Sequence, residues 1–297
     1  AVRSGSGAIT LRPQNPATPI RVGGAADFAL SAAEFAFVTT TGPFTVGRAT
    51  HAGAISLEVA ATVANATGGT TLVNAAGGIA VGADFSAAGG LALTTSGSIA
   101  RTAGTLSTSS GNLVLNADAG IGVIAGPAPV VVSAPTGTIS ATNTTSGDLF
   151  LGTPGAVTIG VAGFAIDQQV ADGAVRVDAG GNLTIGGDVT VAGAGSLELN
   201  AVGTITRTAG TRTAATLRLG TSGSTTAVGA SAIARILTAA TTLLGARATT
   251  GAGVFLSNTG NVNLAAQAAS GAVDILNAGT TTSAGVITAG TTVTVSS

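Results

Sequence analysis

The sequence predicts an all-β protein, a single-stranded right-handed parallel β-solenoid in which the chain winds into stacked coils of three short strands. Three observations support this prediction: a long internal repeat, apolar residues paired at alternate positions, and glycine or asparagine between those pairs. We expect the coils to run over residues 1–297 as a single continuous domain, with one or two short helical turns.

The internal repeat is the strongest of these signals. The stretch 91–105 returns at 197–211, with Leu91, Leu93, Ile99 and the run Arg-Thr-Ala-Gly-Thr all displaced by 106 positions. The strand that follows, 113–115, returns at 217–219 with a displacement of 104. A trimmed surface loop explains the shortfall, and repetition at a fixed period is typical of solenoids.

The spacing of the apolar pairs gives the length of a coil. Such pairs recur at Val175/Val177, Leu183/Ile185, Val189/Val191 and Leu197/Leu199. Three strands therefore fill about 20–22 residues, a length within the range of solenoid repeats, and about 14 coils fit into the chain. Alternation sends one side chain inward and the next outward. Glycine and asparagine, as in 110–113 and 180–183, provide the corners. Right-handedness follows from the general rule for parallel crossovers.

Two segments carry a helical rather than a strand pattern. Ser31 and Glu34 have the spacing of a capping box, and we expect Leu30 and Phe37 to pack the short helix onto the solenoid. The segment 231–244 is a weaker candidate, because Ile233, Leu237 and Ala240 also suit a helix.

The composition excludes several classes of function. Charged residues make up 8% of the chain, and the net charge is −1. This balance predicts no binding of nucleic acid and no attraction to an anionic membrane surface. The apolar stretches are interrupted by proline, serine, threonine and glycine, so we expect no membrane span, which needs about 20 consecutive apolar residues. With no cysteine and one histidine, most metal sites and catalytic triads lack their ligands or base.

Few residues suggest a site. Asp167, Asp172 and Asp178 form the densest carboxylate group, but their spacing matches no calcium loop, and we interpret them as solvated turn residues. His51 has no second histidine or cysteine with which to share a metal and is expected in a loop. The sequence therefore predicts no catalytic, cofactor-binding or metal-binding residues and no cofactor.

An enzyme is the alternative from another functional class. Polysaccharide hydrolysis requires paired carboxylates, usually with aromatic platforms for the sugar, and this chain has neither tryptophan nor tyrosine. An arginine-based lyase stays open, since Arg176, Arg207 or Arg218 could project from one face. We favour arginine side chains on a solvated strand face, and hence a protein that is not an enzyme.

Three stretches resemble a known family. The segments 7–12, 30–47 and 53–57, with their repeated Gly-x-Leu-x-Leu and Gly-x-Ile strands, are similar to the repeat regions of filamentous-haemagglutinin-type bacterial exoproteins. The resemblance covers nearly the whole chain. It implies a β-helical shaft, secretion to the cell surface, and a role in adhesion, aggregation or biofilm. The N-terminal secretion-targeting domain of those proteins is not recognisable in this sequence.

The expected function is therefore that of an extracellular structural or adhesive rod of a bacterial cell surface. One alternative is a self-assembling, head-to-tail filament subunit, because no cap is evident in the sequence at either end. The second alternative is the β-helix polysaccharide lyase or hydrolase. The expected partners are other copies of the chain end to end, or glycans or proteins of a host or cell surface.

Overall fold

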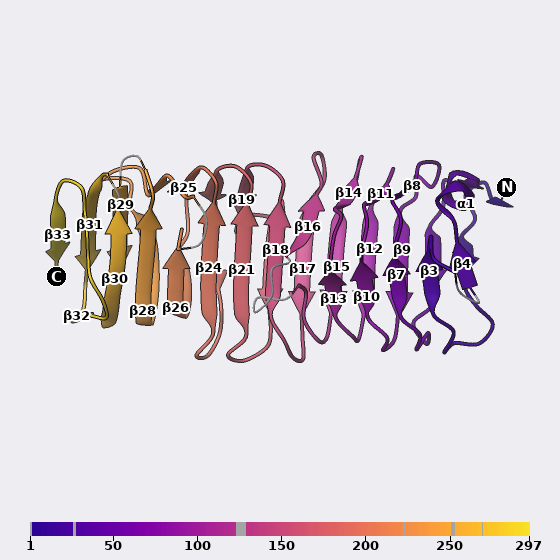
Figure 1. Cartoon of the computed structure of the whole chain (residues 1–297), viewed down its shortest axis with the longest axis horizontal. Helices are drawn as coiled ribbons and strands as arrows, with labels where there is room; N and C mark the ends of the chain where they lie inside the picture. The colour runs from indigo at the N-terminus through magenta and orange to yellow at the C-terminus, as the bar shows by residue number, and fades with distance from the viewer. Residues whose placement is uncertain (1, 26–27, 123–128, 222–223, 251–252, 269) are drawn as a thin grey trace. The chain divides into compact units, whose positions relative to one another are not determined.

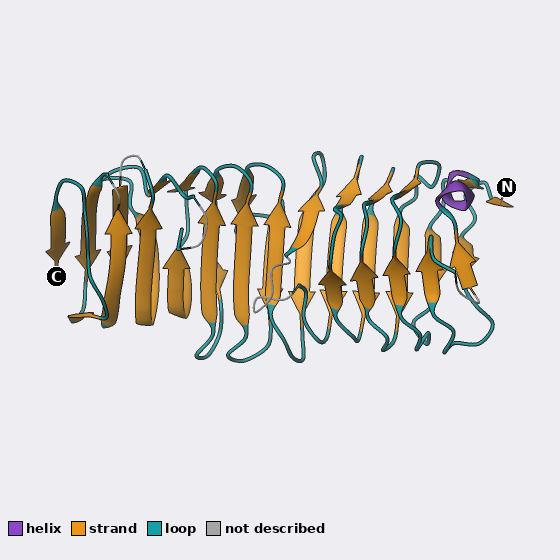
Figure 2. Ribbon diagram, viewed as in Figure 1, coloured by secondary structure: helices purple, strands orange, loops and turns teal. Residues whose placement is uncertain are grey.

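The computed structural model describes residues 2–25, 28–122, 129–221, 224–250, 253–268 and 270–297. It is a parallel β-solenoid with coils of about 22 residues, which confirms the predicted fold class. Figure 2 shows that nearly all of the regular structure is strand, with one helix among the described residues. The chain has about 11 turns rather than about 14, because some coils are longer than 22 residues: Phe44 lies 35 residues after its partner Ile9, and Leu244 lies 27 residues after its partner Leu217.

Contacts divide the chain into two compact units, Ala1–Leu151 and Gly152–Ser297, with the division inside β18 (Leu149–Thr153). The expectation of one continuous domain stays a prediction, and each unit is described by itself. Figure 1 shows the strands of each unit lying next to one another along their long edges.

In the first unit, three parallel columns of strands form the three sides of the coils. The first column is β2 (Ile9–Leu11), β6 (Phe44–Gly47), β9 (Thr70–Asn74), β12 (Leu91–Thr95), β15 (Leu113–Ala117) and β17 (Ile139–Asn143). The second is β4 (Phe28–Leu30), β3 (Ile20–Val22), β7 (Ile55–Leu57), β10 (Ile79–Val81) and β13 (Ile99–Arg101). The third is β8 (Ala61–Val63), β11 (Phe85–Ala87), β14 (Leu106–Thr108) and β16 (Val130–Ser133).

The second unit begins with the same arrangement. Its first column is β21 (Ala174–Ala179), β24 (Ser196–Ala201), β26 (Arg212–Leu219), β28 (Ile236–Ala248), β30 (Val262–Ala268) and β32 (Thr281–Ser283). The second is β19 (Val157–Ile159), β22 (Leu183–Ile185), β25 (Thr204–Arg207), β27 (Ala227–Val228), β29 (Gly253–Asn258), β31 (Ala272–Asn277) and β33 (Val293–Ser296). The third begins with β23 (Val189–Thr190), which pairs with the start of β26; β20 (Phe164–Gln168) precedes β21.

Toward the C-terminus, two sides of the coil merge. The start of β28 continues the third column, because it pairs with the start of β26. In β29, Val254 pairs with β27 of the second column, while Leu256 pairs with Ile236 at the start of β28. The stretch 254–258 contains no glycine, whereas Gly186 and Gly187 separate β22 from β23 in an earlier coil. Without a glycine corner the strand runs on, and the coil there has two longer strands in place of three short ones.

The core of each unit consists of columns of apolar side chains, one from each coil. Leu91 pairs with Leu113 in the next coil, and Leu197 pairs with Leu217, as the sequence predicts. All four leucines are buried. Each apolar side chain stacks on its equivalent in the next coil, and the backbone N–H and C=O groups bond to the neighbouring coils. The same stacking therefore buries the side chains and provides partners for the buried backbone groups.

The helix predicted near the N-terminus is present as α1 (Ala32–Ala36). Ser31 is its N-cap: the Glu34 backbone N–H donates to Ser31 Oγ (3.3 Å), and the Ser31 N–H donates to Glu34 Oε2 (2.7 Å). The predicted contact of Phe37 is wrong, since that side chain is 58% exposed. Phe35 packs instead, edge-on to Phe44 and Phe85 with ring centroids 6.0 and 5.7 Å away.

The second helical candidate, 231–244, is wrong. Residues 231–234 form a turn with an Ala234 N–H to Ser231 carbonyl bond of 3.0 Å, and Ile233 at its tip is 98% exposed. The strand β28 begins at Ile236, and its first five residues alternate between buried and half-buried. Pairing with β26 decides the conformation, because a helix would leave that strand's backbone groups without partners.

The remaining short elements lie near the N-terminus, where β1 (Val2–Arg3) pairs with β5 (Val38–Thr39). No helix among the described residues has both the length and the apolar character needed to cross a bilayer.

Candidate functional site

The densest group of interacting charges lies on the first column of strands in the second unit. Arg176 and Asp178 come from β21, and Glu198 and Asn200 come from β24. The register of these strands places Arg176 beside Glu198 and Asp178 beside Asn200. Because alternate residues of a strand share one face, the four side chains lie together on the outer face of the coil.

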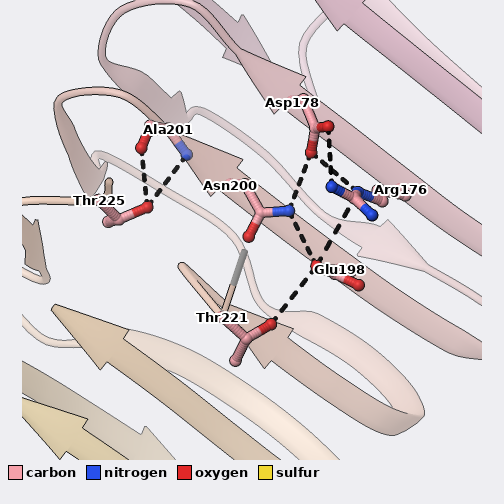
Figure 3. A network of polar contacts seen from close by, with 7 residues as sticks. All are labelled: Arg176, Asp178, Glu198, Asn200, Ala201, Thr221 and Thr225. Atoms are coloured by element: carbon pink, nitrogen blue, oxygen red, sulfur yellow. Dashed lines mark hydrogen bonds and ion pairs between the residues drawn. The ribbon is translucent and has the colours of Figure 1, made fainter. Parts of the chain in front are cut away.

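These four side chains form one hydrogen-bonded network (Figure 3). The Arg176 guanidinium donates to Asp178 through Nε and Nη2, both at 3.0 Å, and its Nε is 3.9 Å from Glu198 Oε1. Asn200 Nδ2 donates to both carboxylates, at 2.9 Å to Asp178 Oδ1 and 2.9 Å to Glu198 Oε1. The amide thus links the two acids, and the guanidinium offsets their charge.

A loop after β26 borders this network. Thr221 Oγ1 donates to Glu198 Oε1 at 3.4 Å. Thr225, which is fully buried, donates to the Ala201 carbonyl (2.8 Å) and accepts from the Ala201 N–H (3.2 Å), as Figure 3 shows. These bonds hold the described ends of the loop against β24.

A shallow open depression of about 200 Å³ accompanies the network, and its lining includes Arg176, Asp178, Asn200, Val202 and Ser224. The carboxylate in this lining, Asp178, already accepts from Arg176 and from Asn200. Such a network holds its side chains in fixed positions and can present polar groups to a ligand. It offers no aromatic platform for a sugar ring, because the chain has no tryptophan or tyrosine.

The interpretation of the three aspartates as solvated turn residues is right for Asp172 but wrong for the other two, since Asp167 lies in β20 and Asp178 in β21. Asp167 accepts from Gln169 Nε2 (2.7 Å) and is exposed. Asp172, in a turn at φ 64°, accepts from the Ala194 N–H, and Asp178 belongs to the Arg176 network. Among the described residues, no group of three or more histidine, cysteine, aspartate or glutamate side chains could hold a metal ion.

The three arginines considered for a lyase occupy two different columns. Arg176 and Arg218 lie on either side of Glu198 in the same ladder position. Arg207 is in β25 of the second column, and its Nε donates to the Gly210 carbonyl at 2.7 Å. Arg176 and Arg207 are therefore engaged in local structure.

Two buried cationic or titratable side chains lie outside this network. His51 is in a loop, as expected, but is fully buried, and neither ring nitrogen has a hydrogen-bond partner among the described residues. Arg212, at the start of β26, is also fully buried; Nη2 donates to the Ala209 carbonyl at 3.3 Å, and Nε and Nη1 have no partner in the described part of the chain. Burial lowers the pKa of Arg212 to about 10, with Asp188 opposing that shift and Arg207 adding to it.

The internal repeat contained a signal for Arg212. The Thr105 N–H donates to Asp84 Oδ1 and the Thr211 N–H to Asp188 Oδ1, both at 2.8 Å, so the two copies build the same corner. The residue after that corner is Leu106 in one copy and Arg212 in the other. Both point into the core, so alignment of the copies places an arginine at a leucine position.

Comparison of the chain with models of known protein families, with curated proteins and with solved structures found no match. The resemblance to filamentous-haemagglutinin-type repeats therefore stays a prediction from the sequence.

Proposed function

We propose that the chain is a non-enzymatic structural and adhesive element of a bacterial cell surface or of the extracellular space. The observation that supports this most directly is that coils of different length keep the same pairing of inward residues. Leu197 pairs with Leu217, and Leu217 pairs in turn with Leu244, although the second of these two coils is the longer one. The columns stay in register because the corner loops, together with a register shift between Ala214 and Thr216 of β26, absorb the extra residues. A scaffold of this kind tolerates and displays loops of different length.

Adhesion of coated particles tests this proposal. Beads that carry the purified chain should aggregate and should bind to cultured cells or to immobilised glycans more than beads that carry serum albumin. A chain unfolded in denaturant and coupled in the same way is the control for non-specific stickiness. Coated beads that neither aggregate nor bind above the albumin level would overturn the adhesive part of the proposal.

The enzymatic alternative has its own test. Incubation with neutral and uronic-acid polysaccharides should release neither reducing ends nor unsaturated sugars. Formation of either product, and its loss on Arg176→Met substitution, would contradict a non-enzymatic role and would place the chemistry at the Arg176 network.

A second candidate function, self-assembly into a filament, is supported by strand β33. Val293 and Val295 continue the inward columns of Val273 and Ile275, yet they are 50% and 39% exposed, whereas Val273 and Ile275 are fully buried. A further coil in the same register, from a continuation of the chain or from a second copy, would cover these valines.

Concentration-dependent sedimentation and electron micrographs of the purified chain test this assembly. Val295→Lys, which places a charge on the uncovered column, should abolish assembly, whereas Thr294→Lys, on the outward side of the same strand, should reduce it less. A chain that stays monomeric at high concentration would exclude the filament.

A further inference from the structure

His51 lies in a turn enclosed between two other segments of the first unit. The turn follows β6, and the His51 N–H donates to the Arg48 carbonyl at 2.9 Å. On one side, the Ala52 and Gly53 N–H groups donate to the Pro16 carbonyl at 2.8 and 3.0 Å. On the other side, the Ala75 N–H donates to the His51 carbonyl at 2.6 Å. The imidazole is thus buried at the point where one coil corner stacks on the next.

The packing around the ring suits only a neutral imidazole. His51 is fully buried, and neither Nδ1 nor Nε2 has a hydrogen-bond partner among the described residues. A buried charge requires a partner or an opposing charge, and without one the loss of hydration is not compensated. Protonation of this ring in place is therefore strongly unfavourable.

The charged groups near the ring add to that effect. Arg48, in the same turn, donates from Nη2 to the Gln14 carbonyl at 3.3 Å and is a second cation close to His51. Of the segments packed on the turn, 11–18 carries only Arg12 as a titratable side chain, and 74–78 carries none. Burial, and next the charge of Arg48, lowers the pKa of His51 below its ordinary value. None of these segments brings a carboxylate.

We propose that the turn 48–53 is a pH-responsive corner of the solenoid, closed while His51 is neutral and opened when His51 is protonated. Opening moves the imidazolium into water and separates the turn from Pro16 and from Ala75. The inference is independent of the adhesive role proposed above, since it concerns a local equilibrium within the first unit.

The sign of the effect follows from linkage. A histidine whose pKa is lower in the folded than in the unfolded state stabilises the closed turn fully above about pH 6.5. That contribution is lost as pH falls from 6.5 to the folded pKa. For each pH unit by which the pKa of His51 in the closed turn lies below 6.5, the equilibrium constant for opening is tenfold larger at acid pH than at neutral pH.

Because the chain has one histidine, nuclear magnetic resonance of the tag-free protein reports this titration without overlap. We expect the His51 Cε1–H signal to titrate below pH 6.5. Over the same range, the amides of Ala52, Gly53 and Ala75 should lose hydrogen-exchange protection after correction for intrinsic exchange. Amides of the ladder between Leu91 and Leu113 serve as the internal reference and should keep theirs.

Two variants complete the test. His51→Leu and His51→Gln carry no titratable group, so protection of the three amides should no longer depend on pH. Titration of the wild-type ring at or above pH 6.5, or retention of amide protection below the observed titration, would overturn the proposal. A folded variant in which protection of the three amides still depends on pH as in the wild type would also overturn the proposal. The wild-type measurement decides the question even if neither variant folds.

Discussion

At the scale of single residues, Arg212 is the clearest departure from the pattern of the fold. It occupies the inward position that Leu106 holds in the first copy of the repeat, between Val189 and Thr238 in its column. Its Nε and Nη1 have no partner in the part of the chain that the structure describes, and a buried guanidinium in this state costs free energy that an apolar side chain does not.

Arg212→Leu should therefore raise the free energy of unfolding, by about 1–3 kcal/mol. The reciprocal change, Leu106→Arg, introduces the same charge into the equivalent corner and should lower it by at least as much. Urea titrations of the three proteins measure both effects. A clear loss of stability in Arg212→Leu would show that an unseen partner stabilises the guanidinium.

The same residue predicts an unusual dependence of stability on alkaline pH. The chain contains no lysine, tyrosine or cysteine, so no other side chain titrates near pH 10. Because burial lowers the pKa of Arg212 to about 10, the unfolded chain holds more protons there, and stability should rise with pH. Between pH 9 and 11 we expect a gain of about 1 kcal/mol in denaturant titrations. The gain should vanish in Arg212→Leu.

Glycine is required where two corners lie in contact. Gly104 (φ 75°) and Gly210 (φ 73°) occupy equivalent positions, and a Cβ on them would lie 2.1 Å from the Ala83 carbonyl carbon and 2.2 Å from that of Gly187. Gly104→Ala and Gly210→Ala should each destabilise the chain by about 1–3 kcal/mol, because backbone strain and contact add. Gly5→Ala, where the Cβ meets nothing within 4 Å, is the matched control in thermal unfolding.

At the scale of elements, α1 shows how local and tertiary signals combine. The capping box of Ser31 and Glu34 was readable from spacing, because it depends only on neighbouring residues. The spacing did not reveal which phenylalanine packs. Phe35 lies in this helix of five residues and Phe37 is its C-cap, so the direction of the strand that follows decides which ring faces the core.

Removal of the N-cap should destabilise this helix. Ser31→Ala deletes the acceptor for the Glu34 N–H and should cost about 1 kcal/mol, whereas Ser31→Thr keeps the acceptor and should cost less. The cost should appear in the free energy of unfolding of the first unit. Equal stability of Ser31→Ala and the wild type would mean that burial of Phe35 alone fixes the helix.

The strand β28 shows the opposite balance. The segment 231–244 has an acceptable helical spacing, and no local residue forbids a helix. Its strand conformation comes from pairing with β26 and β30, neighbours that lie far along the sequence. Tertiary hydrogen bonding overrides a weak local preference of this kind.

At the scale of the whole chain, the small number of charges predicts stability that is nearly independent of salt. Four ion-pair contacts are found in the described residues, and all involve partly exposed side chains. Such pairs contribute about 0–1 kcal/mol each and are screened by salt. Unfolding free energy in urea should therefore change by less than about 1 kcal/mol between 0.05 and 1 M sodium chloride. A larger loss would assign a main stabilising role to the Arg176 network.

The sequence by itself determined the solenoid, the coil length and the pairing of Leu91 with Leu113 and of Leu197 with Leu217. These follow from periodicity, and a repeated pattern of inward residues has one way to bury them all. Alignment of the two copies of the repeat also places Arg212 at the inward position of Leu106. The tertiary structure alone decided that His51 is fully buried, that Asn200 links Asp178 to Glu198, and that the last coils have two strands. Each of these depends on which residues of neighbouring coils lie side by side, and loops of unequal length shift that register in ways that local spacing does not reveal.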